Sequence, residues 1–153
     1  MEITLKIKSL EETEELAKII AEWAYPGMVI GLAGDLGAGK TTFTKFFARA
    51  LGIKDNVNSP TFTILKIYEN KIPLYHIDAY RLETGSRDFD LEEYIYGDGI
   101  SVIEWYPYLK DMLPKTYLTI SLEVIQSNKR LAKIEGDGFN EEIVKAISDR
   151  YSN

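Results

Sequence analysis

The chain has 153 residues, of which 45% are hydrophobic and 27% are charged; this composition is typical of a globular protein and the length predicts one domain over residues 1–153. Cysteine is absent and His76 is the one histidine, which excludes a disulfide framework, a thiol nucleophile and a metal centre built from cysteine or clustered histidine. The net charge of −6 argues against a purely electrostatic nucleic-acid binder, so we expect another subunit to hold any nucleic acid.

Membrane and export signals are not evident in the sequence. Apolar runs such as residues 28–33 are far too short to cross a bilayer. The start, Met1-Glu2-Ile3-Thr4, lacks the basic and then apolar layout of a signal peptide. We therefore expect a cytoplasmic protein without membrane contact.

The first predicted elements are a strand and a helix. Ile3, Leu5 and Ile7 alternate with polar residues, which predicts a strand with one solvated face, near a sheet edge. Ser9 followed by Glu12 is typical of a capping box at a helix start. Apolar residues at helical spacing then predict a helix that ends before a Pro-Gly pair.

A buried strand and a second helix follow. Residues 28–33 show no alternation, which predicts a strand covered on both faces, as in a central parallel sheet. The spacing of the aromatic residues predicts a helix over residues 40–51, with Gly52 as its left-handed cap. Strand, loop and helix form half of a βαβ unit and predict a parallel neighbouring strand.

The second half of the chain predicts five further strands, at Phe62–Tyr68, Leu74–Ile77, Ile100–Glu104, Tyr117–Ile125 and Leu131–Glu135. The first two are separated by three polar residues and predict a hairpin, so the sheet is not fully parallel. A short helix is expected over residues 90–96, and a final amphipathic helix from Asn140 onward.

A phosphate-binding motif lies between the buried strand and the second helix. Residues 34–41 match G-x-x-x-x-G-K-[ST] without a mismatch and Thr42 follows; the eight are Gly34, Asp35, Leu36, Gly37, Ala38, Gly39, Lys40 and Thr41. The glycines let backbone amides approach phosphate oxygens, and the helix start adds its positive end. Lys40 is expected to contact the β- and γ-phosphates and Thr41 a Mg²⁺ ion. The motif predicts a P-loop NTPase-like α/β fold, three-layered α/β/α with a mixed, mostly parallel central sheet.

ATP is favoured over GTP. The guanine-reading pattern Asn-Lys-x-Asp is incomplete at Asn70-Lys71-Ile72-Pro73, which ends in proline. Thr13, at the start of the first helix, is a candidate for contacting the adenine, with helix capping as the alternative.

Two acids are candidates for completing the site. Glu104 and Asp78 end predicted strands, and the carboxyl ends of parallel strands lie on the phosphate side of such a sheet. Either acid is a candidate for holding Mg²⁺, directly or through water. His76 shares the strand face of Asp78 and is either structural or a charge sensor near the γ-phosphate.

The loop at residues 58–62 contains Thr61 and is either a simple turn fixed by Pro60 or a switch that senses the γ-phosphate through a hydroxyl. Arg81 is either a surface residue or a cation for developing phosphate charge.

Taken together, these segments resemble the TsaE (YjeE) family of P-loop ATPases. The resemblance rests on residues 34–42, 59–62, 76–82 and 104–105, in the order and spacing of the family. Two positions depart from the family pattern, namely Ala79, usually leucine, and Tyr106, usually proline or a small residue.

The resemblance implies ATP and Mg²⁺ binding and slow hydrolysis. It implies docking onto a TsaB–TsaD complex that transfers the threonylcarbamoyl group to an adenosine of tRNA, so that tRNA is met through that complex. It also implies that Thr41 and Glu104 ligate the metal, that the loop at residues 58–62 is a switch, and that His76 and Asp78 face the γ-phosphate or the partner.

Lys40, Asp78, Glu104 and His76 are thus the expected catalytic residues of a partner-stimulated ATPase. Two other functions remain open: a nucleotide-dependent binding switch with negligible turnover, and a small-molecule kinase. The kinase is disfavoured because residues 82–99 are acidic around a single Arg87 and would repel a phosphorylated acceptor.

Overall fold

The computed structural model describes residues 1–35, 37–57, 65–79, 91–127 and 129–151. Its strands are β1 (Glu2–Ile7), β2 (Val29–Ala33), β3 (Leu65–Tyr68), β4 (Leu74–Asp78), β5 (Ile100–Glu104), β6 (Leu118–Gln126) and β7 (Lys129–Glu135). The helices are α1 (Leu10–Glu22), α2 (Lys40–Ala50), α3 (Leu91–Ile95), the 3₁₀ segment η2 (Tyr106–Met112) and α4 (Asn140–Tyr151).

The strands within the described residues form one mixed sheet in the order β1-β7-β6-β2-β5-β4-β3. β2 is parallel to both its neighbours, β5 and β6, and β4 is parallel to β5. β3 and β7 are antiparallel to their neighbours, and β1 pairs with β7 so that it runs in the direction of β6. Five of these seven strands therefore point the same way, which confirms a mixed, mostly parallel sheet.

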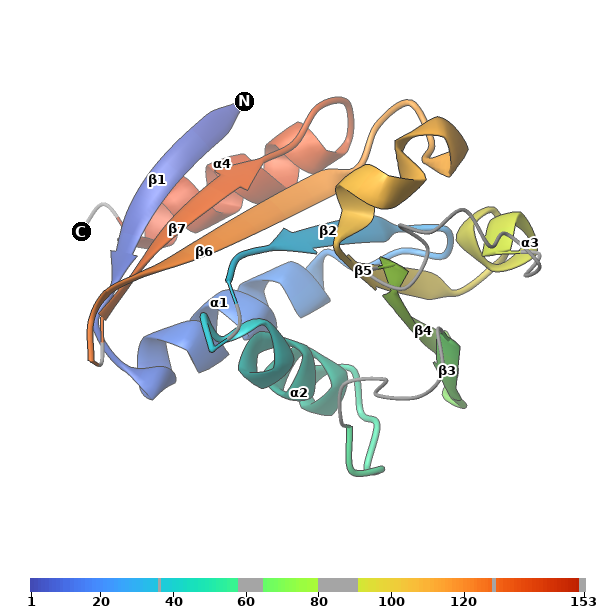
Figure 1. The fold of residues 1–153 in the computed structure, drawn as a ribbon, viewed down its shortest axis with the longest axis horizontal. Helices are drawn as coiled ribbons and strands as arrows, with labels where there is room; N and C mark the ends of the chain where they lie inside the picture. The colour runs from blue at the N-terminus through green and yellow to red at the C-terminus, as the bar shows by residue number, and fades with distance from the viewer. Residues whose placement is uncertain (36, 58–64, 80–90, 128, 152–153) are drawn as a thin grey trace.

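The two faces of the sheet are covered unequally (Figure 1). One face packs against α1, α2 and α4, with Phe43 and Phe47 of α2 fully buried. On the other face, Val29, Ile77 and Ile103 pack with the short α3 and with η2. Because both faces of the sheet are covered, residues of β2 that point to either face are buried, which accounts for the unbroken apolar run in this strand. The result is the expected three-layer α/β/α arrangement.

Several local predictions are confirmed. β3 and β4 form the antiparallel hairpin, β1 lies at a sheet edge, and Gly52 adopts the left-handed conformation after α2, with φ of 95°. Ser9 caps α1, since its Oγ accepts from the amide of Glu12 at 3.2 Å. None of the helices in the described segments is long and apolar enough to span a bilayer.

The segment after β5 was not predicted. Trp105 has a left-handed backbone with φ of 60°, and η2 begins directly after it, with Pro107 in its first turn. Burial explains the departure, because Leu109 and the half-buried Tyr106 pack onto the sheet. A Cβ at Gly31 of β2 would lie 2.7 Å from the Tyr106 ring, so this glycine makes room for η2.

Candidate nucleotide-binding site

The predicted site residues meet at the carboxyl ends of three adjacent strands. The glycine-rich loop follows β2, Glu104 ends β5, and Asp78 ends β4. In the parallel register Glu104 lies beside Leu32 on one side and Asp78 on the other. The sequence-based expectation that both acids lie at the edge of the sheet that carries the loop is therefore correct.

The loop has a backbone that requires glycine at three positions. Gly34, Gly37 and Gly39 have φ of 143°, 84° and 107°, a region that residues with a Cβ rarely adopt. At Gly34 space is also decisive, because a Cβ there would lie 2.5 Å from the carbonyl oxygen of Leu122 on β6. The amide of Ala38 donates to the Asp35 carbonyl at 3.0 Å, which closes a tight turn. Leu36 lies outside the described residues.

Helix α2 begins at the end of this loop without a side-chain cap. Gly39 occupies the N-cap position, and no acidic residue lies in the first turn. The first amides of any α-helix lack acceptors within the helix, and the aligned peptide dipoles make this end positive. Thr41 and Thr42 lie in this first turn and are half-buried. This combination suits an anion.

Lys40 adds a full positive charge to the same place. Its side chain is only 6% exposed, and its Nζ donates to the Gly34 carbonyl at 2.6 Å. The ammonium also lies 4.5 Å from the centre of the Trp105 ring, which is the range of a cation–π contact. These two contacts hold the ammonium group of Lys40 beside the glycine-rich loop.

His76 and Glu104 form a buried pair. The Nε2 atom of His76 lies 2.8 Å from Oε2 of Glu104, with the histidine side chain fully buried and the glutamate side chain 8% exposed. When Glu104 is ionised, the proton of this contact lies on Nε2, because a carboxylate only accepts hydrogen bonds. In the described part of the chain, Nδ1 of His76 has no hydrogen-bond partner. This contact restrains the Oε2 atom of Glu104.

The comparison with known proteins adds a family to this geometry. A family model described as threonylcarbamoyl adenosine biosynthesis protein TsaE matches residues 7–132. The chain belongs to the TsaE family. The Bacillus subtilis (strain 168) protein called tRNA threonylcarbamoyladenosine biosynthesis protein TsaE is 46% identical over 142 residues, which cover 92% of this chain and 84% of that protein.

Further relatives agree across distant bacteria. The Treponema pallidum (strain Nichols) protein of the same description is 39% identical over 125 residues, covering 80% of this chain and 93% of its own length. Among solved structures, the crystal structure of Bacillus subtilis YdiB superimposes with a TM-score of 0.82 at 37% identity, covering all of this chain (100%) and 97% of that one. The TsaE family and the P-loop NTPase-like fold expected from the motifs are thus confirmed.

The remaining predicted residues of this TsaE family member differ in how the structure places them. Asp78 is half-buried at the end of β4, and Thr13 is half-buried in the first turn of α1. The amide of Thr13 donates to the Ser9 carbonyl at 3.3 Å, which is an ordinary helical contact, and its role toward adenine stays a prediction. The loop at residues 58–62 with Thr61, and Arg81, lie outside the described residues.

Metal binding by this TsaE site would use few protein ligands. Among the described residues no three carboxylate or imidazole side chains cluster together. Mg²⁺ usually keeps several waters and takes one or two protein oxygens plus phosphate oxygens. The first-turn hydroxyl of Thr41 and the carboxylate of Glu104 are donors of that kind, so the residues fit Mg²⁺.

Two residues that contact the loop were missed as site residues. Trp105 was noted only as part of the family pattern, yet its left-handed backbone brings its ring to Lys40. Arg130 of β7 was not singled out at all, and its Nε donates to the carbonyl oxygen of Ala38 at 3.0 Å. Neither contact follows a local sequence signal.

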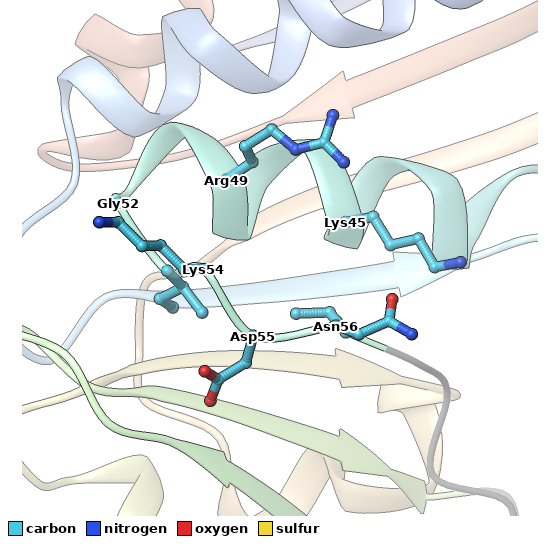
Figure 2. A pocket seen from close by; sticks show the side chains of 8 residues that line it. Lys45, Arg49, Gly52, Lys54, Asp55 and Asn56 are labelled. Carbon is cyan, nitrogen blue, oxygen red and sulfur yellow. The ribbon is translucent and has the colours of Figure 1, made fainter.

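A separate groove runs along the exposed side of α2 (Figure 2). It lies between that helix and residues 52–57, and its lining includes Lys45, Arg49, Lys54 and Asp55. The groove is a local basic patch on an acidic chain, and none of the predicted TsaE site residues lines it.

Proposed function

We propose that this TsaE family member binds ATP with Mg²⁺ and hydrolyses it slowly, on behalf of a partner complex of the TsaB–TsaD type that forms threonylcarbamoyladenosine in tRNA. The tRNA is met through that complex. One observation carries the proposal. The start of α2, where Gly39 is the cap and Lys40 adds a positive charge, lies at the same edge of the sheet as Glu104, which is hydrogen-bonded to His76.

In this proposal the backbone amides of Gly37 and of residues 39–41 bind the polyphosphate and Lys40 neutralises it. On binding, Lys40 would replace part of its contacts with the Gly34 carbonyl and the Trp105 ring by contacts with phosphate oxygens. The phosphate oxygens carry negative charge and the Gly34 carbonyl does not, so the exchange adds attraction between opposite charges and favours the bound state.

The acids share the remaining work. Thr41 and Glu104 hold the metal ion, which when bound neutralises charge that develops on the phosphates. His76 keeps Glu104 in one orientation, as residues behind metal ligands commonly do. Asp78, beside Glu104 in the strand register, orients the attacking water or accepts its proton.

The proposal is tested by single-turnover hydrolysis of ATP, alone and with the partner pair. We expect slow release of phosphate that the pair accelerates. Thr41→Ala and Glu104→Ala should lower the rate more than ATP affinity, and Asp78→Ala should lower the rate. ATP-dependent partner binding without phosphate release would support the binding switch instead, and consumption that depends on a small-molecule acceptor would support a kinase.

A further inference from the structure

A half-buried arginine reaches the phosphate loop from outside. Arg130 lies near the start of β7, opposite Val124 of β6 and Ile7 of β1. Its Nε donates to the carbonyl oxygen of Ala38 at 3.0 Å, across 92 positions of sequence. Ala38 is 1% exposed and Arg130 is half-buried, so this hydrogen bond is partly shielded from water.

One terminal nitrogen of the guanidinium contacts its own hairpin. Nη1 of Arg130 donates to the carbonyl oxygens of Gln126, Ser127 and Lys129 at 3.4, 3.3 and 3.2 Å. Because the guanidinium is planar and its donors have a fixed geometry, these contacts set the direction of Nε. The β6–β7 hairpin therefore presents one oriented donor to the loop.

That donor determines how one peptide group of the loop faces. The bond between Ala38 and Gly39 is trans, and in a planar trans peptide the N–H points away from the preceding C=O. A carbonyl held toward Arg130 thus keeps the amide of Gly39 pointing away from the hairpin. This is one of the amides that the proposed function assigns to the phosphates.

The loop needs such a restraint because glycine surrounds the peptide. Gly37 and Gly39 flank Ala38 with φ of 84° and 107°, and glycine lets a peptide plane rotate at little cost. A rotated plane would turn a carbonyl oxygen toward an anion. On its other side Ala38 is already held, since its amide donates to Asp35 at 3.0 Å.

We propose that Arg130 is a positioning residue that orients the Ala38–Gly39 peptide and so sets the affinity for the nucleotide polyphosphate. The part that concerns affinity rests on the proposed function; the orientation of the peptide does not. Restraining a binding loop in its bound conformation lowers the entropic cost of binding.

The first test uses the nucleotide-free protein. Amide hydrogen exchange of residues 37–41, followed by NMR, is compared in the wild type, Arg130→Ala and Lys129→Ala. We expect the amide of Gly39, which belongs to the peptide that Arg130 orients, to exchange at least about tenfold faster in Arg130→Ala, with no change in Lys129→Ala, the exposed neighbour on the same hairpin. Equal exchange in all three proteins would overturn the proposal.

The second test is calorimetric titration with Mg·ATP. Arg130→Ala should bind about tenfold more weakly, with the midpoint of thermal unfolding within about 2 °C of the wild type and the single-turnover rate at saturation unchanged. Unchanged affinity would overturn the proposal. A wild type that binds no ATP would refute the proposed function, while the exchange measurement would still decide the role of Arg130.

A second variant guards against loss of the fold. If Arg130→Ala lowers the unfolding midpoint by more than about 10 °C, Arg130→Lys replaces it in both measurements. It keeps the stem and the charge, but a single ammonium cannot bond Ala38 and the three hairpin carbonyls together. We expect the same faster exchange at Gly39, and its absence would overturn the proposal.

Discussion

Helices α1 and α2, which lie on the same face of the sheet, begin in opposite ways. At the start of α1, Ser9 accepts from the amide of Glu12 at 3.2 Å, and Glu12 accepts from the amide of Lys8 at 2.7 Å. Acidic Glu11 and Glu12 lie in its first turn. At the start of α2 the cap is Gly39, which has no side chain to accept from the amides, and no acid is in the first turn.

The difference separates a helix that is complete in itself from one that is built to take a ligand. α1 satisfies its amides and its dipole with its own side chains. In α2 the cap position is a glycine, and the first turn carries Lys40 where α1 has acidic residues. Both differences favour binding of an external anion at the start of α2. The predictions below test this contrast, from the largest expected effect to the smallest.

Removal of the cation at α2 should have the largest effect. Lys40→Ala should weaken ATP binding by about 3 kcal/mol, because it removes a charge-assisted contact from a poorly solvated site. The matched control is Lys45→Ala on the exposed side of the same helix, which should leave affinity unchanged. Titration calorimetry decides, and a loss of less than threefold for Lys40→Ala would contradict the account.

Backbone freedom at the α2 cap should matter next. Gly39→Ala adds a Cβ that meets only the distant Cδ1 of Leu122 at 3.9 Å, so its cost of about 1–2 kcal/mol is conformational. Gly52→Ala, at the other end of α2 with φ of 95° and open space around it, carries a similar strain.

Both glycine variants should lose similar stability in urea unfolding. Only Gly39→Ala should also lose ATP affinity, because only Gly39 lies in the anion-facing loop. Equal ATP affinity in the two variants would show that the loop does not use this conformation to bind.

The cap of α1 should affect stability alone. Ser9→Ala should lower the free energy of unfolding by about 1 kcal/mol, as removal of an N-cap does, and should leave ATP affinity unchanged. Ser9→Asp, which can still cap, should recover most of the loss. A drop in ATP affinity for Ser9→Ala would break the proposed separation between the two helix starts.

The smallest expected effect concerns a tyrosine that is bonded to the first turn of α1. The hydroxyl of Tyr151 in α4 donates to the Glu12 carbonyl at 2.7 Å. Burial, and then the negative charges of Glu12 and Glu15, raise the pKa of Tyr151 from 10.0 to about 12. Between these two values the unfolded chain loses the proton and the folded chain keeps it, so stability is full below pH 10 and falls as the pH rises toward 12.

Tyr151→Phe should reduce this alkaline loss, measured as the unfolding midpoint from pH 9 to 12. Tyr25, whose pKa is also raised by burial, remains in the variant and should leave part of the slope. An identical pH profile for the variant and the wild type would contradict the assignment.

The local elements were readable from the sequence where one physical cause acts over a few residues. The capping pair at Ser9, the buried run in β2 and the glycine pattern of the loop all specify their own backbone. The hairpin of β3 and β4 follows from two strand patterns and a short polar turn. These features also sufficed to predict that Glu104 and Asp78 end strands on the side of the loop.

Long-range partners were not readable. His76 and Glu104 were each predicted as site residues, but their contact depends on the register of β4 against β5. That register cannot be read from the sequence of either hydrophobic strand alone. The contact of Arg130 with Ala38 depends on β6 lying beside β2. The left-handed turn at Trp105 serves the packing of η2 and has no glycine or asparagine to mark it.

The most direct test is a crystal structure with Mg²⁺ and a non-hydrolysable ATP analogue. The account predicts β- and γ-phosphate oxygens within hydrogen-bonding distance of the amides of Gly37 and of residues 39–41, with the ion held by Thr41 and Glu104. Polyphosphate bound away from the start of α2, or Glu104 directed away from the ion, would contradict it.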